Sequence, residues 1–122
     1  MSEHPALAKL RAAAFALPES EERLSHGQPT FFVAGKQFAQ FRNDHHGDGV
    51  TGVCVKTSGL DEQAMLLEAE PKLYSRPAYL GPSGWISINL APADTDWDHV
   101  AEWLAKSWAR AAPRRLVGKA RR

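Results

Sequence analysis

Residues 76–90 read RPAYLGPSGWISINL, and this stretch decides the fold. Its turn-forming run at residues 81–84 leads into residues 85–90, whose aromatic and β-branched side chains are typical of a strand. Pro77 and Tyr79 stiffen the loop ahead of the turn and give it one aromatic hydroxyl. The stretch therefore predicts a loop, a tight turn and the last strand of a sheet, and it carries no catalytic motif.

The segments before this stretch predict the rest of the sheet. Strands are expected at residues 30–33, 37–42 and 50–57, with a hairpin connection at 34–36 and a short connector or edge strand at 72–75. In the second of these strands, Phe38 and Phe41 cannot share one face of an unbroken pleat, because same-face positions differ by two. Either a bulge intervenes between the two rings, or one ring lies on the exposed face.

Apolar residues recurring at helical spacing predict three helices, at residues 5–17, 61–70 and 97–111. Short polar side chains accept hydrogen bonds from the free N–H groups of a first turn. The expected caps, in chain order, are Ser2, then Ser58 or Asp61, then Thr95. The expected buried stripes are Leu60, Ala64 and Leu67 on the second helix, and Trp97, Val100, Ala101, Leu104, Trp108 and Ala111 on the third. Trp103 lies off that last stripe, so we expect it to be partly exposed.

These elements predict an α+β fold in which helices pack on one face of an antiparallel sheet, since each apolar stripe must be buried. A chain of 122 residues with 43% apolar side chains fits one domain with a core, which we place at residues 1–112. No apolar run approaches the roughly 18 residues that span a bilayer. We expect a cytoplasmic monomer without a membrane role. Cys54 is the only cysteine, which leaves no internal disulfide.

Charge is unevenly distributed along the chain. Residues from Lys106 onward carry +7 and no acid, which leaves about −6 for the rest of a chain whose net charge is +1. Residues 113–122, with Arg114 and Arg115, are expected to be a mobile basic tail. Such a tail binds DNA weakly and in a salt-sensitive manner, although it is more often a solubilising extension.

Six short segments in order resemble the MmcQ/YjbR-like family. They are residues 26–31, 35–39, 53–56, 77–80, 84–86 and 107–108. The resemblance covers the chain from the first helix to about Ala111. It implies a fold similar to frataxin (CyaY-like) and the description "DNA-binding". The chain departs from the family pattern at Trp108, where a Tyr is usual, and in a somewhat long loop at residues 44–49.

The likeness to frataxin does not extend to iron binding. Frataxin-type iron binding uses an acidic first helix, whereas here that helix carries Lys9 and Arg11 with only Glu3 at its start. The loop at residues 44–48, which reads DHHGD, contains metal-ligand types, but adjacent residues in one loop rarely converge on an ion. We therefore expect no metal and no cofactor.

His26 lies in a Gly-Pro turn, where its imidazole is able to contact a phosphate or act as a base. We favour the alternative that it hydrogen-bonds the turn and helps to hold Tyr79 or Trp85. For Cys54, between two valines of a strand, a packed thiol is favoured over a nucleophile.

A basic and aromatic surface is the remaining candidate. Cations for phosphates and rings for bases are what nucleic-acid binders use. The residues that would form it are Lys36, Lys56, Arg76, Tyr79 and Trp85. The alternative, which we favour, is separate surface lysines and core aromatics.

The sequence thus supports two functional hypotheses and one weaker alternative. The first is a small DNA-binding protein, and the second is an interaction or small-ligand-binding module that uses the cleft around His26, Lys56, Arg76, Tyr79 and Trp85. An enzyme ranks behind both, because no nucleophile–base pair, phosphate loop or metal motif is visible and no catalytic residue is assigned.

Overall fold

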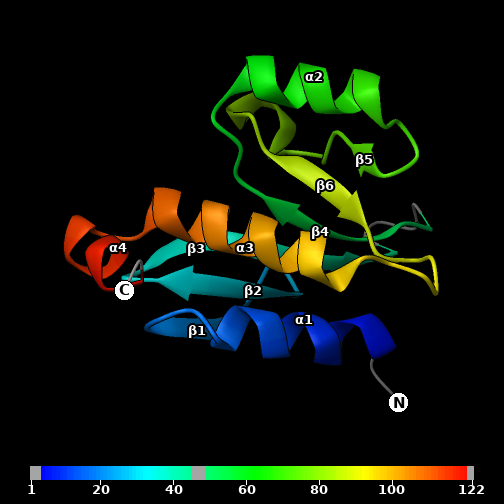
Figure 1. Cartoon of the computed structure of the whole chain (residues 1–122). Helices are drawn as coiled ribbons and strands as arrows, with labels where there is room; N and C mark the ends of the chain where they lie inside the picture. The colour runs from blue at the N-terminus through cyan, green and yellow to red at the C-terminus, as the bar shows by residue number, and fades with distance from the viewer. Residues whose placement is uncertain (1–3, 45–48, 121–122) are drawn as a thin grey trace.

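Six antiparallel strands form one sheet in the order β1-β2-β3-β4-β6-β5 in the computed structural model, which describes residues 4–44 and 49–120. The strands are β1 (Ser20–Ser25), β2 (Gln28–Val33), β3 (Lys36–Asn43), β4 (Thr51–Val55), β5 (Tyr74–Ser75) and β6 (Ile86–Asn89). The helices are α1 (Pro5–Phe15), α2 (Leu60–Ala69), α3 (Trp97–Ala111) and α4 (Arg114–Ala120), with a 3₁₀ turn η2 (Gly81–Ser83) (Figure 1). The α+β prediction is confirmed.

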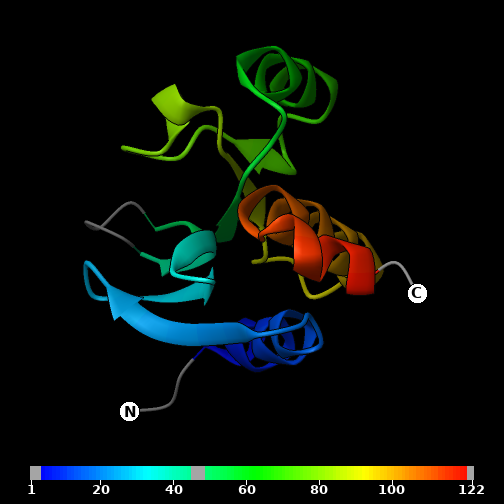
Figure 2. The ribbon, with the colours of Figure 1, turned by 90° about the vertical axis from the view of Figure 1, so that its left-hand side faces the viewer.

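Helices α1, α3 and α4 lie on one side of the sheet, and the loop that contains η2 projects on the opposite side (Figure 2). Helix α3 packs across β3 and β4, with α1 beside it, while α2 packs against the edge strand β5. The core therefore lies between α1, α3 and one face of the sheet. The other face carries no helix in the part of the chain that the structure describes.

A bulge in β3 explains how Phe38 and Phe41 are both buried. Phe31 pairs with Ala39 but Phe32 pairs with Gln37, so Phe38 is the extra residue between two registers. Phe38 is fully buried and Phe41 is 4% exposed. Of the two alternatives left open by the sequence, the bulge is the one that the fold adopts.

Ser107 forms hydrogen bonds with two backbone groups that have no partner on the neighbouring strand because of the bulge. Its hydroxyl donates to the carbonyl oxygen of Phe38 and accepts, at 2.8 Å, from the backbone N–H of Lys56 just beyond β4. Ser107 itself is fully buried on α3. One side chain thus joins the helix to two strands far away in the sequence.

Strand β1 is an element that the sequence pattern does not reveal. Its residues are mostly polar and it lies at the sheet edge, where it pairs only with β2. Glu22 on this strand receives two hydrogen bonds from the Arg11 guanidinium, at 2.7 and 2.8 Å, which tie β1 to α1. Without alternating apolar side chains, only the pairing with β2 identifies the strand.

The buried stripe predicted for α2 is wrong at two of its three positions, and the third residue, Leu67, is partly buried against the core. Leu60 is 54% exposed and Ala64 is exposed, whereas Gln63 is the buried residue of the helix. The Gln63 side-chain amide donates to the carbonyl oxygens of Gly81, at 2.9 Å, and Trp85, at 2.6 Å. Helix α2 therefore holds the η2 turn through a polar contact. Its N-cap is Gly59, without a side-chain cap from Ser58 or Asp61.

Two other predicted caps and one predicted exposure also need correction. Asp96 caps α3 by accepting from the N–H of His99 at 3.2 Å, while Thr95 bonds back to Pro92. His4 caps α1, and the predicted cap Ser2 lies outside the described residues. Trp103 is only 4% exposed, because β5 packs against that side of α3.

The predicted mobile tail is also wrong over most of its length. Residues 114–120 form α4, Leu116 is buried in the core, and Arg115 pairs with Glu19 at 3.2 Å. Arg121 and Arg122 lie outside the described residues. None of the helices that the structure describes is long and apolar enough to cross a membrane.

We predict that Ser107→Ala lowers the free energy of unfolding by about 1–3 kcal/mol, because two buried backbone groups lose their partner. Ser58→Ala is the matched control, since its exposed side chain caps nothing in the structure and should cost under about 0.5 kcal/mol. Urea denaturation of the two variants measures both values. Equal stability of the two variants would contradict the role given to Ser107.

Candidate functional site

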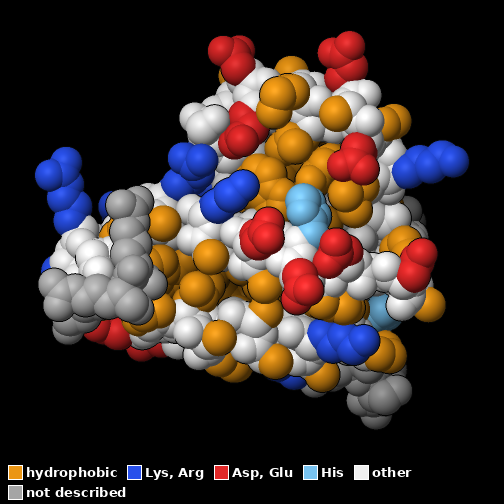
Figure 3. Space-filling model, in the orientation of Figure 1, with side chains coloured by type: hydrophobic (Ala, Val, Ile, Leu, Met, Phe, Trp, Pro, Cys, Tyr) orange, Lys and Arg blue, Asp and Glu red, His pale blue; other side chains and the backbone are white. Residues whose placement is uncertain are grey.

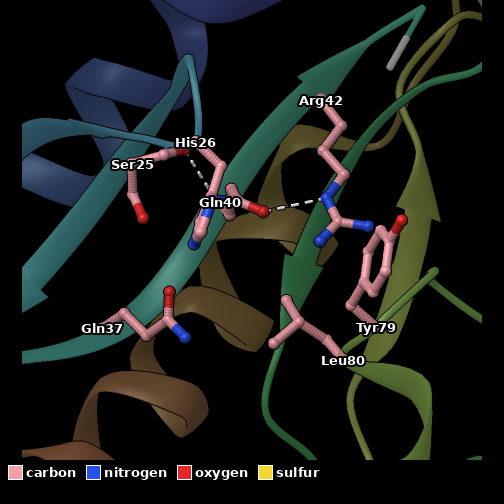
Figure 4. A pocket seen from close by; sticks show the side chains of 7 residues that line it. All are labelled: Ser25, His26, Gln37, Gln40, Arg42, Tyr79 and Leu80. Atoms are coloured by element: carbon pink, nitrogen blue, oxygen red, sulfur yellow. Dashed lines mark hydrogen bonds between the residues drawn. The ribbon is translucent and has the colours of Figure 1, made fainter. Parts of the chain in front are cut away.

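The helix-free face of the sheet carries a hollow of about 410 Å³, which we call the first hollow (Figure 4). Its lining residues are Ser25, His26, Gln37, Gln40, Arg42, Tyr79 and Leu80. Gln40 and Arg42 alternate along β3 with Phe41, which points into the core, so they point to the opposite face. Sheet and loop segments far apart in the sequence thus meet around one concavity.

A second hollow of about 560 Å³ adjoins the first, because Gln37 and Leu80 line both. We call the two hollows together the groove. Three cations line the second hollow, each from a different element. These are Lys36 at the start of β3, Lys56 just after β4, and Arg110 near the end of α3.

His26 is positioned by a two-residue hairpin turn. Ser25 pairs with Gln28, and the two residues between them have positive φ, 52° at His26 and 77° at Gly27. That geometry matches the turn that best suits the twist of a hairpin, and histidine tolerates it better than most side chains. The turn directs the imidazole into the first hollow beside Gln40 (Figure 4).

Arg42 is held by a relay of buried polar groups. The Gln40 amide, 4% exposed, donates to Thr30 Oγ1 at 3.0 Å and to the carbonyl oxygen of Ser25 at 3.3 Å. Its own oxygen accepts from Arg42 Nε at 2.8 Å, and Arg42 Nη1 donates to the carbonyl oxygen of Ala78 at 2.9 Å. The guanidinium is therefore fixed from the strand side and from the loop side.

Tyr79 combines high exposure with a strained backbone. Its side chain is 76% exposed and its φ is +66°, a region that bulky residues rarely adopt. The neighbouring Ala78 receives the Arg42 hydrogen bond, and Figure 4 shows the ring and the guanidinium at the same end of the first hollow. Strain of this kind concentrates at ligand-binding loops, so Tyr79 is a candidate binding residue.

The electrostatics of the groove favour an anion. Its lining residues include Lys36, Lys56, Arg110 and Arg42, and no carboxylate. Glu62 approaches Arg110 only at 3.9 Å. The helix-bearing face differs, because acidic side chains are spread over it (Figure 3), including the exposed Asp98 and Glu102 of α3.

The structure separates the predicted site residues into three groups. His26 and Tyr79 line the first hollow, and Lys36, Lys56 and Trp85 line the second. Arg76 lines neither; its side chain packs over Gly81, where an added Cβ would lie 2.7 Å from Arg76 Cγ. Arg114 and Arg115 are exposed on α4, outside both hollows.

Trp85 does not offer a stacking surface. It is 5% exposed, and the Lys56 ammonium lies over its ring, with Nζ 5.7 Å from the ring centroid. Trp85 therefore belongs to the packing under the second hollow. Among the residues that line the groove, the exposed aromatic ring is that of Tyr79.

Sequence reasoning missed Gln37, Gln40, Arg42 and Arg110, which all line the groove. A signal was present for two of them. Gln40 and Arg42 are two residues apart in a predicted strand, so they share one face, and that face is polar. Arg110 had no such signal, because its approach to the strands depends on how α3 crosses the sheet.

A second polar cluster joins β5 to α3 on the other side of the sheet. The Tyr74 hydroxyl accepts from Trp103 Nε1 at 3.3 Å and shares a hydrogen bond with His99 Nε2 at 2.7 Å. Burial raises the pKa of Tyr74, and the Trp103 hydrogen bond opposes this rise. The cluster keeps polar groups satisfied where the edge strand meets the helix, and we assign it to the fold.

Neither a metal centre nor a reactive thiol emerges from the described ranges, 4–44 and 49–120. No three His, Cys, Asp or Glu side chains converge there, and His45, His46 and Asp48 lie outside those ranges. Cys54 is fully buried in β4, which confirms the predicted packed thiol.

Comparison with known proteins gives a family and a fold. The family model described as YjbR matches residues 15–110. The chain is similar to the crystal structure of Deinococcus radiodurans protein DR2400, a DUF419 domain, with a TM-score of 0.69 and 19% identity over 85% of this chain and 76% of that one. No curated protein matches the chain.

We predict that the variant Tyr79→Gly is more stable than Tyr79→Ala by about 1 kcal/mol, because both lose the ring but only glycine relieves the positive φ. The control is Ala78→Gly next to it, whose φ is not positive and which should lose about 0.5–1 kcal/mol. Thermal unfolding of the three variants decides the order. If Tyr79→Ala proves the more stable of the pair at position 79, the backbone there is not strained.

Proposed function

The chain belongs to the YjbR family, and we propose that it is a non-enzymatic binding protein that holds single-stranded DNA in the groove. The observation that carries the proposal is a pair of adjoining hollows that share Gln37 and Leu80 and are lined by four cations and no carboxylate. Phosphate neutralisation by lysine and arginine supplies most of the affinity for a nucleic-acid backbone. The groove provides those charges from elements that the core holds in place.

The arrangement of the cations suits a strand that runs along the groove. Lys36, Lys56 and Arg110 surround the second hollow, and Arg42 lies in the first, beyond the shared wall of Gln37 and Leu80. A strand lying across both hollows would present successive phosphates to these side chains. Exposed lysines bind phosphates as point charges, which suits recognition without a fixed sequence.

The shape of the groove favours a single strand over a duplex. Proteins read duplex DNA by inserting a helix or a β-ribbon into the major groove, whereas this surface is concave. Unpaired bases, by contrast, can be placed against aromatic rings. The exposed Tyr79 offers such a ring at the edge of the first hollow.

The folded C-terminal segment changes what the basic residues there contribute. Arg115 is paired with Glu19 and Leu116 is buried, so residues 114–120 are not the free basic tail that the sequence predicts. Arg114 remains exposed on α4. We therefore place the main contact with DNA in the groove and give α4 a supporting, salt-sensitive role. The monomeric state and the cytoplasmic location remain predictions.

A second candidate function is the binding of a small anionic molecule. The first hollow, at about 410 Å³, falls within the roughly 300–1,000 Å³ typical of small-molecule sites. Under this alternative, a small anionic ligand would raise the melting temperature of the protein and an oligonucleotide would have no effect, whereas an oligonucleotide held in the groove would itself raise it. That contrast separates the two candidate functions.

We predict that the double variant Lys36→Gln/Lys56→Gln binds a labelled oligothymidine more weakly than the native chain. The slope of log affinity against log salt should fall by about 0.7 for each phosphate that the variant no longer neutralises. The matched control is Lys9→Gln/Lys72→Gln, which removes the same charge from exposed positions outside the groove. Fluorescence anisotropy at low and high salt measures both slopes.

If the two double variants lose the same affinity for oligothymidine, the binding arises from general electrostatics, and the groove is not the binding site. Tighter binding of duplex than of single-stranded DNA would contradict the strand specificity. The role of α4 is tested by Arg114→Gln rather than by truncation, because removing residues 113–122 would also remove the buried Leu116. We expect Arg114→Gln to have a smaller effect than the Lys36/Lys56 pair.

A further inference from the structure

We infer that the first hollow binds one nucleotide unit, with its phosphate on Arg42 and its base against Tyr79. For a nucleotide within a strand, this inference rests on the proposed function; for a free nucleoside monophosphate, it stands alone. It assigns the most enclosed part of the groove to a defined chemical group. In a strand, the lysines of the second hollow would contact the phosphates that follow this nucleotide.

The donors of Arg42 are arranged for an oxyanion. Nε donates to Gln40 and Nη1 to the carbonyl oxygen of Ala78, which leaves both N–H groups of Nη2 and one of Nη1 for a ligand. Those remaining donors belong to a planar, fixed guanidinium, and the oxygens of a phosphate are able to accept from them. No carboxylate in ranges 4–44 and 49–120 forms an ion pair with Arg42.

Gln40 makes this a built site rather than a surface arginine. It is 4% exposed, and both ends of its amide are committed, to Thr30 and Ser25 on one side and to Arg42 on the other. A guanidinium fixed in this way loses little side-chain freedom when an anion arrives. Gln40 is thus a positioning residue, whereas Arg42 contacts the ligand.

The remaining walls of the hollow suit a base. Tyr79 presents an exposed ring from a strained backbone, and Leu80 adds an apolar wall. The side chains of Gln37 and His26 reach into the hollow (Figure 4) and form no hydrogen bond within the part of the chain that the structure describes. They are available to the polar edge of a base, which a bare inorganic anion would not use.

The test compares three probes on the native chain by isothermal titration and amide chemical shifts. The probes are thymidine monophosphate, thymidine and inorganic phosphate. We expect thymidine monophosphate to bind about tenfold or more tightly than either of the others, since each lacks one of the two contacts. Equal affinity for inorganic phosphate would overturn the base contact, and equal affinity for thymidine would overturn the phosphate contact.

Two variants test the assigned residues. Arg42→Lys keeps the positive charge but loses the planar guanidinium with its several N–H donors, so the affinity for thymidine monophosphate should fall about tenfold. The control Arg76→Lys, outside the groove, should leave it unchanged. Arg42→Lys with native affinity would overturn the inference. The Gln40→Met variant keeps Arg42 and should lower the affinity for thymidine monophosphate, while the affinity for uncharged thymidine stays unchanged. An equal loss of affinity for both probes would overturn the positioning role of Gln40.

An oligothymidine and an abasic oligomer of equal length separate this inference from the proposed function. Tyr79→Leu should lower the affinity for the oligothymidine about tenfold and leave the affinity for the abasic oligomer unchanged. If neither oligomer binds the native chain but thymidine monophosphate does, the proposed function fails and the nucleotide site stands. If the oligothymidine binds and neither Arg42→Lys nor Tyr79→Leu changes its affinity, the site fails and the proposed function stands.

Discussion

The hydroxyl of Ser107 is the contact on which the rest of the arrangement depends. It accepts the Lys56 N–H and donates to the Phe38 carbonyl, and so it ties α3 to the bulge of β3 and to the end of β4. Lys36 and Gln37 immediately precede that bulge, and Arg110 lies one helical turn after Ser107. Within the apolar core that packs α3 on the sheet, Ser107 thus links the three segments that carry the cations of the second hollow. The same two hydrogen bonds of Ser107 satisfy buried backbone groups and hold the segments that line the second hollow.

The polar face of the sheet is maintained by a comparable device. Gln40 and Thr30 are buried, so an unpaired amide or hydroxyl there would be costly, and each finds its partner within the relay that ends at Arg42. The Gln63 amide holds the start and the end of the η2 turn from the other side. The loop that carries Tyr79 is thus anchored at both ends by glutamine or arginine side chains. Its exposed ring projects from a fixed frame.

Local pattern predicts the parts of this fold whose signals are local. The β-branched run before Leu90, the regular stripe of α3 and the buried Cys54 are examples, and the family resemblance matches the YjbR model over residues 15–110. Long-range contacts decide the rest. The exposure of Trp103 depends on β5, and α4 is fixed by the burial of Leu116, although Pro113 suggests an end to regular structure. Arg110 enters the site only through the crossing of α3 over the sheet, whereas Arg42 shares the polar face of a predicted strand with Gln40. The likeness to frataxin remains a prediction.

Amide chemical-shift mapping with a single-stranded oligothymidine tests the central claim most directly, because it locates the contact without a variant. We predict that the largest shifts fall on the groove, namely on residues 25–26, 36–42, 56–57 and 78–85, with little change in α1. Shifts confined to α4 and the C-terminal end of the chain would contradict it. Binding would then arise from the basic C-terminal residues, and the groove would have no part in it.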